Sequence, residues 1–205
     1  EEFLDKTGVT EDYIHIQDGV KIAMALENCG IDFIDVSVGL YETGSVCVEP
    51  ISFPQGWRKD LIKAVKDHVS IPVIGVSCIR EPQVAESFLE GGIVDFVSMG
   101  RSWLADEQWG LKVLEGRENE ICKCINCLRC FESLNAWMGA GIPAECAVNP
   151  RACRERLYGN AEYDTQEHKV VVVGGGPCGM IVAKTLAERG MKVTLVDRQS
   201  ELGGT

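Results

Sequence analysis

Apolar and polar residues follow two different periods along the first half of the chain. From Ile16 to Asn28 apolar residues recur every three or four positions and Gly30 follows, which predicts an amphipathic helix with a stop just after it. The next stretch, IDFIDVSVG, is almost continuously apolar, as expected of a buried strand. The same alternation predicts helices over about 56–69, 82–90 and 107–114, and strands over 71–77 and 94–100. We therefore expect consecutive βα units with a parallel sheet that is buried on both faces.

The pattern divides the chain into three parts. The βα units occupy residues 1–117, and a segment rich in Cys, Gly and Pro follows over 118–167, ending in the expected linker GNAEYDTQEH. The third part, 168–205, contains one strand, one helix and a second strand. Three strands leave open sheet edges, and one βαβ unit is too small to bury its own sheet. We therefore expect both ends to continue into further parts of the same protein.

Composition narrows the classes of partner. The chain has 205 residues with 31 acidic and 20 basic side chains, so its net charge is -11. Such a charge repels phosphate backbones, which argues against nucleic acids and anionic membranes as partners. The sequence contains no signal peptide and no long apolar run, and we expect a cytoplasmic protein. In that compartment a tight group among the ten cysteines indicates metal binding or redox chemistry rather than disulfides.

A glycine-rich turn lies near the C-terminal end. The sequence VVVVGGGPCG places Gly174, Gly176 and Gly179 in the spacing Gly-x-Gly-x-x-Gly, between a valine-rich strand and a helix. These glycines permit a tight turn, a close approach of the backbone to a pyrophosphate, and close packing of helix on strand. Asp197 ends the second strand, where a carboxylate can accept hydrogen bonds from a ribose. The sequence predicts a dinucleotide site, and the motif alone leaves FAD and NAD open.

The cysteine group predicts an iron–sulfur cluster. Cys124, Cys127 and Cys130 have the spacing Cys-x2-Cys-x2-Cys within CKCINCLRC, and Cys146 follows at a distance. One loop can supply three thiolates to a cluster while a remote cysteine closes the cage. We therefore expect these four residues to be the ligands.

Two other cysteines compete for the fourth place, and zinc competes with the cluster. Cys122 forms a Cys-x-Cys pair with its neighbour, and Cys153 lies beyond the stretch NPRA. Four thiolates also satisfy tetrahedral zinc, although three evenly spaced cysteines and a remote one fit a cluster better than two zinc knuckles.

Four motifs in this order, DFVSMGRSWLAD, CINC, CAVNPRA and GGGPCG, resemble the flavin-dependent family that includes 2,4-dienoyl-CoA reductase, trimethylamine dehydrogenase and the clostridial-type enoate reductases, related to old yellow enzyme. The resemblance covers essentially the whole chain. It implies an α/β protein made of the C-terminal part of a (β/α)8 TIM barrel that binds FMN, an iron–sulfur segment with a 4Fe-4S cluster, and the start of a Rossmann-like domain for FAD or ADP.

The resemblance also implies roles for individual residues. Gly100 and Arg101 would hold the FMN phosphate through a backbone amide and a guanidinium group. Ser77 and Cys78, at the end of the preceding strand, would complete the phosphate cradle with backbone amides. Tyr41 occupies the place where some relatives carry a substrate-facing histidine, and its phenol would donate a proton or a hydrogen bond to the substrate.

The function that the resemblance implies is electron transfer from NAD(P)H through FAD and the cluster to FMN, and then to an activated carbon–carbon double bond. The substrate would be an unsaturated acid or an acyl-CoA. An amine dehydrogenase is the first alternative, and the spacing of CLRC matches that branch of the family. The second alternative is an electron-transfer module like the small subunit of glutamate synthase, in which no barrel precedes the cysteines.

Overall fold

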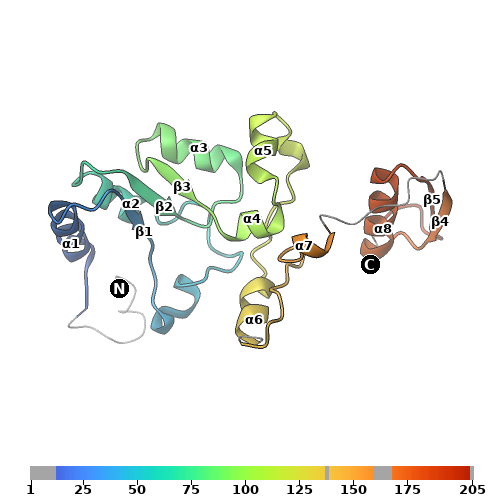
Figure 1. The fold of residues 1–205 in the computed structure, drawn as a ribbon, viewed down its shortest axis with the longest axis horizontal. Helices are drawn as coiled ribbons and strands as arrows, with labels where there is room; N and C mark the ends of the chain where they lie inside the picture. The colour runs from blue at the N-terminus through green and yellow to red at the C-terminus, as the bar shows by residue number, and fades with distance from the viewer. Residues whose placement is uncertain (1–12, 137–138, 159–167, 204–205) are drawn as a thin grey trace. The chain divides into compact units, whose positions relative to one another are not determined.

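The computed structural model describes residues 13–136, 139–158 and 168–203. The chain divides into two compact units, Glu1–Glu155 and Arg156–Thr205. Each unit has its own parallel sheet (Figure 1). The expected linker, apart from its last residue, lies outside the described residues. We describe the two units separately.

The first unit is built on a three-stranded parallel sheet with the strand order β1-β2-β3. The strands and the helices that precede or connect them are α1 (Ile16–Asn28), β1 (Ile34–Val36), α2 (Lys59–Lys66), β2 (Val73–Val76), α3 (Pro82–Glu90) and β3 (Phe96–Ser98). Each element of the βα pattern is therefore present, and the strands are shorter than their apolar stretches. The prediction of consecutive βα units with a parallel sheet is confirmed.

The core of the first unit lies between the sheet and the helices. Ile62 of α2 and Val73 of β2 are completely buried, and Phe88 of α3 is 2% exposed. A Cβ added at Gly75 in β2 would lie 2.6 Å from Val94, so the absence of a side chain allows this close packing. Burial of these apolar side chains stabilises the sheet. The hydrogen-bond ladder between β2 and β3 holds the carboxyl ends of these two strands in register.

The buried face of α1 contains fewer residues than its apolar pattern predicts. Val20 and Ala23 are buried, whereas Ile22, Met24 and Leu26 are each more than 40% exposed. Ile22 and Leu26 line an apolar hollow of about 350 Å³ beside β1. The apolar residues of α1 thus extend beyond the surface that the described residues cover.

Short helices follow the sheet and continue into the cysteine-rich segment. These elements are α4 (Arg101–Ala105), α5 (Trp109–Leu114), the 3-10 turn η3 (Glu118–Glu120), α6 (Arg129–Ala136) and α7 (Glu155–Tyr158), whereas the 3-10 turn η2 (Tyr41–Val46) lies between β1 and α2. The expected helix over about 107–114 begins at Trp109, and a separate helix, α4, precedes it. Helix α6 was not predicted, because its eight residues include cysteine, serine and asparagine, which obscure the helical period.

The second unit contains one βαβ arrangement. Its elements are β4 (Lys169–Val173), α8 (Pro177–Glu188) and β5 (Lys192–Val196), and β4 pairs with β5 in parallel. Helix α8 begins at Pro177, inside the GGGPCG motif, and this proline lies in its first turn. Proline suits that place because its fixed φ is helical and the first turn needs no donor from it. No helix within the described ranges is long and apolar enough to cross a membrane.

Candidate cofactor sites

A small cavity lies at the carboxyl ends of β2 and β3. Its volume is about 40 Å³, and its lining residues are Val76, Cys78, Ile79, Arg80, Ser98, Met99, Gly100, Arg101, Ser102 and Asn126. The structure thus brings together Cys78, Gly100 and Arg101, three of the four residues expected to cradle the FMN phosphate. A Cβ added at Gly100 would meet nothing within 4 Å, so the backbone there is open to a ligand.

The fourth expected cradle residue, Ser77, lies behind this cavity rather than in its lining. Its side chain is completely buried, and its Oγ accepts a hydrogen bond of 2.9 Å from the backbone N–H of Arg58. Its carbonyl oxygen accepts a hydrogen bond of 2.8 Å from the N–H of Gly56. These bonds position the end of β2, and the expected contribution of Ser77 to phosphate binding stays a prediction.

A buried carboxylate joins two arginines beside the cradle. Glu49 is 2% exposed and lies 2.8 Å from Arg58, which is 4% exposed. Arg101 donates to both the carboxylate and the backbone carbonyl of Glu49, each at 2.6 Å. Burial lowers the pKa of Arg58, and the negative charge of Glu49 opposes that change. Arg101 is therefore fixed in place and is not a solvated surface residue.

This arrangement carries an excess of positive charge. Two guanidinium groups face one carboxylate, and within the described part of the chain the Nε atoms of Arg58 and Arg80 are buried without a hydrogen-bond partner. Buried donors and buried charge are costly unless an acceptor or counter-charge satisfies them. Arg80 and Arg101 line the cavity, so a phosphate group there would supply a counter-charge to both, and these two residues fit the phosphate of FMN.

The cysteine loop contains residues in strained backbone conformations. Asn126 and Leu128, between the expected ligands, have φ values of 48° and 62°, and Cys78 in the cradle has 55°. Asparagine tolerates this left-handed region, whereas leucine rarely adopts it. Such strain persists where surrounding contacts impose it, and it gathers at functional sites. The left-handed residues turn the chain sharply between Cys124 and Cys130.

Helix α6 brings the remote cysteine back to this loop. Ser133 Oγ on α6 accepts a hydrogen bond of 2.9 Å from the N–H of Glu145. Arg129, also on α6, lies 2.6 Å from the Glu145 carboxylate. Both contacts hold the residue directly before Cys146 against the helix that begins beside Cys130.

The four expected ligands interact electrostatically. Burial raises the pKa of the Cys124 and Cys130 thiols, and smaller contributions come from Cys146 to both and from Cys127 to Cys130. Arg101 lowers the pKa of both buried thiols. Cys127, Cys130 and Cys146 therefore each lie close enough for their charge to act on at least one of the two buried thiols, and Arg101 lies close enough to act on both Cys124 and Cys130.

The described residues contain no group of three or more His, Cys, Asp or Glu side chains arranged for a metal ion. A single zinc ion with Zn–S distances of about 2.3 Å needs its sulfur atoms almost in contact. A cluster binds each thiolate through a different iron atom, so its sulfur atoms lie farther apart. The ligand set thus stays a prediction, supported by thiol chemistry and by convergence of the loop.

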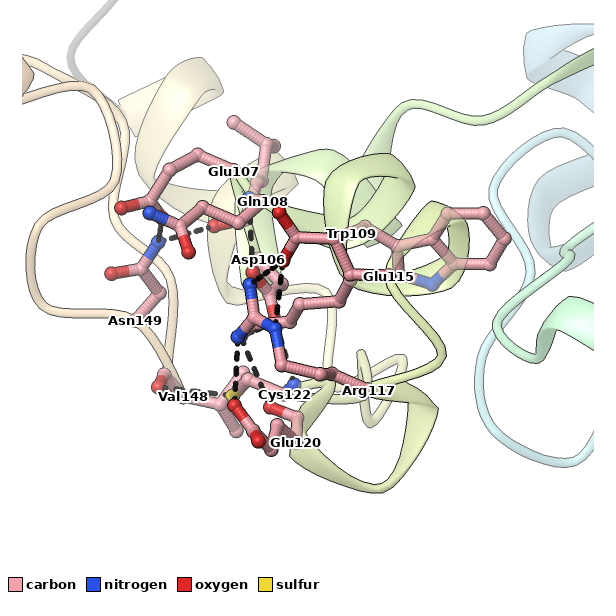
Figure 2. Close-up of polar contacts among 12 residues, drawn as sticks. Asp106, Glu107, Gln108, Trp109, Glu115, Arg117, Glu120, Cys122, Val148 and Asn149 are labelled. Atoms are coloured by element: carbon pink, nitrogen blue, oxygen red, sulfur yellow. Dashed lines mark hydrogen bonds and ion pairs between the residues drawn. The ribbon is translucent and has the colours of Figure 1, made fainter.

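A network of polar contacts anchors the cysteine segment to the end of the βα unit (Figure 2). The Asp106 carboxylate is 2.6 Å from Lys112 Nζ, and it accepts hydrogen bonds from the N–H groups of Cys122 at 2.8 Å and Gln108 at 3.0 Å. Burial opposes ionisation of Asp106, but these donors outweigh it, and the pKa of the carboxyl is lowered. The Cys122 thiol donates to the carbonyl of Val148 at 3.6 Å.

The other end of the cysteine segment, at Asn149, is also attached to the end of the βα unit. Asn149 Nδ2 donates a hydrogen bond of 2.9 Å to the carbonyl of Leu104 in α4, and Figure 2 shows this asparagine beside Glu107. Cys122 therefore lies at the anchor rather than in the loop of the expected ligands. Cys153, the other competing cysteine, is exposed, and its N–H donates to Glu155.

Tyr41 is the first residue of the turn η2, and its side chain is 89% exposed. Its expected role toward a substrate stays a prediction. Sequence reasoning missed Glu49, Arg58, Arg80 and Asn126. No motif marks the first three, whereas Asn126 stands inside CINC and could have been noticed there.

The glycine turn of the second unit shows the geometry of a nucleotide-binding loop. Gly174 has a φ of 106°, and a Cβ added at Gly179 would lie 1.8 Å from the carbonyl oxygen of Gly174. A Cβ at Gly176 would meet nothing within 4 Å, so this backbone is open to a ligand. A glycine is thus needed at each position for a different physical reason. Gly174 adopts a backbone conformation that favours glycine, Gly179 allows close packing, and Gly176 leaves its backbone accessible to a ligand.

Asp197 closes this turn. Its carboxylate accepts hydrogen bonds from the N–H groups of Gln199 at 2.8 Å and Gly175 at 2.6 Å, and these bonds lower its pKa. It also lines an open cavity of about 440 Å³ with Gly174 and Arg198. The ionised carboxylate is therefore placed at the turn, and its contact with a ribose stays a prediction.

Comparison with known families and proteins identifies the class. The model described as "NADH:flavin oxidoreductase / NADH oxidase family" matches residues 4–120, and that described as "NAD(P)-binding Rossmann-like domain" matches residues 172–205. The fold and these matches place the first unit in a family of flavin oxidoreductases, and residues 172–205 resemble a Rossmann-like nucleotide-binding domain. The chain belongs to the NADH:flavin oxidoreductase / NADH oxidase family, and the family resemblance read from the sequence is confirmed.

Individual relatives agree with this assignment. The chain is 43% identical over 190 residues to an NADH oxidase of Thermoanaerobacter brockii, covering 92% of this chain and 29% of that protein. It is 30% identical over 190 residues to a cinnamate reductase of Clostridium sporogenes, with coverages of 92% and 28%. The chain thus spans less than a third of the length of these curated relatives.

Solved structures show the same similarity. A 2-naphthoyl-CoA reductase in complex with 2-naphthoyl-CoA matches with a TM-score of 0.81 and 28% identity, covering 92% of this chain and 28% of that one. Histamine dehydrogenase from Rhizobium sp. 4-9 matches with a TM-score of 0.77 and 29% identity, with coverages of 92% and 27%.

Proposed function

We propose that this chain is part of an enzyme that passes electrons from NAD(P)H through FAD and a 4Fe-4S cluster to FMN, and then to an activated carbon–carbon double bond. Residues 1–117 would form the C-terminal units of an FMN-binding (β/α)8 barrel, 118–167 the cluster segment, and 168–205 the start of the FAD domain. The cinnamate reductase among the relatives supports an unsaturated acid or acyl-CoA as substrate. The remaining parts of the same protein would complete the enzyme.

One observation carries the proposal: the cysteine loop reaches the cavity that would hold the flavin phosphate. Asn126, between Cys124 and Cys127, lines the cavity at the carboxyl ends of β2 and β3 together with Arg101, and its N–H donates to the Cys124 sulfur at 3.4 Å. A flavin phosphate held at this arginine would therefore lie beside a cluster held by the cysteine loop. Short separation between redox centres is the contribution that a protein makes to electron transfer between its cofactors.

The residues of this chain would bind and position the cofactors. Bound FMN would supply a hydride to the β carbon of the substrate. Arg101 and the N–H of Gly100 would hold the phosphate, and Tyr41 would donate a proton or a hydrogen bond to the substrate. The glycine turn and Asp197 would hold the dinucleotide of the second unit. A cytoplasmic location is part of the proposal, because a tight group of cysteines that binds a cluster suits a reducing compartment.

The test uses the full-length protein, purified without oxygen. Iron, acid-labile sulfide and zinc are measured together with the flavins released on denaturation. We expect four irons and four sulfides, FMN and FAD in the wild type, loss of the cluster in Cys124→Ser, and its retention in the matched control Cys29→Ser. Zinc without iron, or no flavin in the wild type, would refute the proposal and favour a zinc-stabilised binding domain.

Turnover is measured on the same preparations. NAD(P)H should reduce both flavins and the cluster, and cinnamate or an enoyl-CoA should then reoxidise them. Because one relative is an NADH oxidase, oxygen alone is tested as the acceptor. If oxygen reoxidises the cofactors and no unsaturated acid or thioester does, the proposed reduction of a carbon–carbon double bond is wrong. The activity would then be that of an NADH oxidase.

Amine dehydrogenation is the second candidate function. Its specific support is the histamine dehydrogenase among the similar structures, together with the short CLRC spacing. In that case electrons would flow from an amine to an external acceptor, and the second unit would hold ADP. Release of ADP in place of FAD, with reduction by amines and not by NAD(P)H, would establish it. The glutamate synthase-like module has less support, because the family match begins at residue 4 and covers the βα units.

A further inference from the structure

Asn126 joins the cysteine loop to the phosphate cradle. It stands between Cys124 and Cys127, and its side chain is 3% exposed although it belongs to a loop. A buried amide is costly unless its donors and its acceptor are satisfied. The contacts of this side chain therefore show what the loop is attached to.

The amide contacts both candidate sites. Its Nδ2 donates to the Cys78 sulfur at 2.7 Å and lies 3.4 Å from the carbonyl oxygen of Glu49. On the other side, the backbone N–H of Asn126 donates to the Cys124 sulfur at 3.4 Å, a bond that a cluster-bound thiolate would keep. The Cys124 thiol also donates to Oδ1 at 3.3 Å, and ligation would remove this bond because a thiolate has no proton to donate. One residue thus bonds a proposed cluster ligand on one side and the cradle on the other.

The backbone carbonyl oxygen of Glu49 is contacted by residues of both candidate sites. The Glu49 carbonyl accepts from Asn126 and also accepts a hydrogen bond of 2.6 Å from Arg101. A displacement of the cysteine loop would therefore be transmitted to the arginine proposed to hold the phosphate. The left-handed backbone of Asn126, at a φ of 48°, lets the N–H and the side chain reach opposite partners.

We infer that Asn126 is a positioning residue that fixes the distance between the cluster and FMN and sets the electrostatic environment of Cys124. The inference rests on the proposed function and adds to it a residue that ligates neither cofactor. Hydrogen bonds to cluster sulfurs tune the reduction potential, and residues that support metal ligands typically change affinity or activity 10- to 100-fold when replaced.

Two variants separate the side chain from the backbone. Asn126→Gly keeps the left-handed conformation and the backbone N–H to Cys124, and it removes only the amide. Asn126→Asp keeps the size and shape, but it replaces the donor toward Cys78 and Glu49 with a negative charge. Asn135→Ala is the control, because Asn135 is exposed on α6 and its amide bonds only the carbonyl of Phe131 among the contacts that the structure describes.

The measurements are made on the full-length protein under anaerobic conditions. They are iron content, the dissociation constant of FMN, the cluster potential by redox titration, and the rate of electron transfer from cluster to FMN after rapid reduction. We expect Asn126→Gly to retain the cluster while FMN binding and the transfer rate each fall about 10- to 100-fold. Asn126→Asp should in addition lower the cluster potential, because negative charge disfavours the reduced cluster.

The outcomes distinguish this inference from the function on which it rests. A wild type without iron or flavin refutes the proposed function. A wild type with both cofactors, and an Asn126→Gly variant with unchanged FMN affinity and transfer rate, refutes the inference alone. Loss of iron in both variants with unchanged FMN affinity also refutes it, since the residue would then serve the cysteine loop and make no link to the cradle.

Discussion

The Glu49→Gln substitution tests the buried charge network most directly. Glutamine keeps the shape of the side chain and removes the charge that faces Arg58 at 2.8 Å and Arg101 at 2.6 Å. Removal of one partner from a buried ion pair costs about 3–5 kcal/mol, because the other charge stays buried and uncompensated. Arg58 is 4% exposed and cannot reach water, whereas Arg101 is 22% exposed and can turn outward. We therefore expect a loss at the lower end of this range, about 3 kcal/mol.

The free energy of unfolding is measured by urea titration of the flavin-free full-length protein. Trp57 provides a local signal, since its Nε1 donates a hydrogen bond of 3.1 Å to the Glu49 carboxylate. The matched control is Asp67→Asn, which removes a carboxylate 2.6 Å from Lys63 on the exposed face of α2. A pair of this exposed kind contributes about 0.5 kcal/mol or less, so the control should unfold almost as the wild type does.

A double variant identifies the cause of the loss. Glu49→Gln combined with Arg58→Met removes the uncompensated charge as well, so the two substitutions should cost less than the sum of their separate effects by at least about 1 kcal/mol. If Glu49→Gln unfolds within about 0.5 kcal/mol of the wild type, or if the double variant is simply additive, the reasoning from a buried charge network is wrong.

Three further predictions concern other parts of the chain. Asp106→Asn should destabilise the first unit at pH 7, and because the pKa of Asp106 is lowered on folding, the difference from wild type in urea titrations should shrink as the pH falls below about 4. Gly179→Ala should prevent folding of the second unit, since its Cβ would lie 1.8 Å from the carbonyl oxygen of Gly174. Hydrogen exchange would show this as a loss of protection of the backbone amides of β4 and β5. Gly176→Ala should fold as the wild type does and bind FAD or ADP at least about 10-fold more weakly by calorimetry, and equal affinity would contradict the role of that backbone.

The sequence predicted the elements whose signal is local and periodic. The three strands and the helices between them follow from apolar runs and the 3.6-residue period, and the βαβ unit follows from valines, glycines and a terminal acid. Helix α6 was missed because half of its residues, Cys130, Phe131, Ser133 and Asn135, are weak helix formers, and tertiary contacts such as the one between Ser133 and Glu145 hold it in place. The exposure of Met24 on α1 was also not predicted. Periodicity shows which residues share a face of a helix, but it does not show how much of that face a neighbouring element covers.

The candidate sites divide in the same way. Cysteine spacing and the glycine turn could be read directly, because each puts several reactive or small residues into one short segment. The charge network could not, since Glu49, Arg58 and Arg101 come from three separate segments of the chain, Arg101 being the first residue of α4, and no short pattern records that meeting. A buried arginine looks like any surface arginine in a sequence until its neighbours are known.

This division explains why the link between the two sites is visible only in the structure. The cysteine loop and the cradle are each recognisable alone, and their separation along the chain, from Cys78 to Asn126, gives no sign of contact. The contact exists because Asp106 and Asn149 fasten both ends of the cysteine segment to the end of the βα unit. Between these anchors the loop folds back to the carboxyl ends of β2 and β3, where Asn126 lines the cavity and reaches the Cys78 sulfur. We therefore expect the polar anchors, which lie outside both ligand sets, to help set the spacing of the proposed cofactors, and substitutions at those anchors should alter electron transfer while leaving every proposed ligand in place.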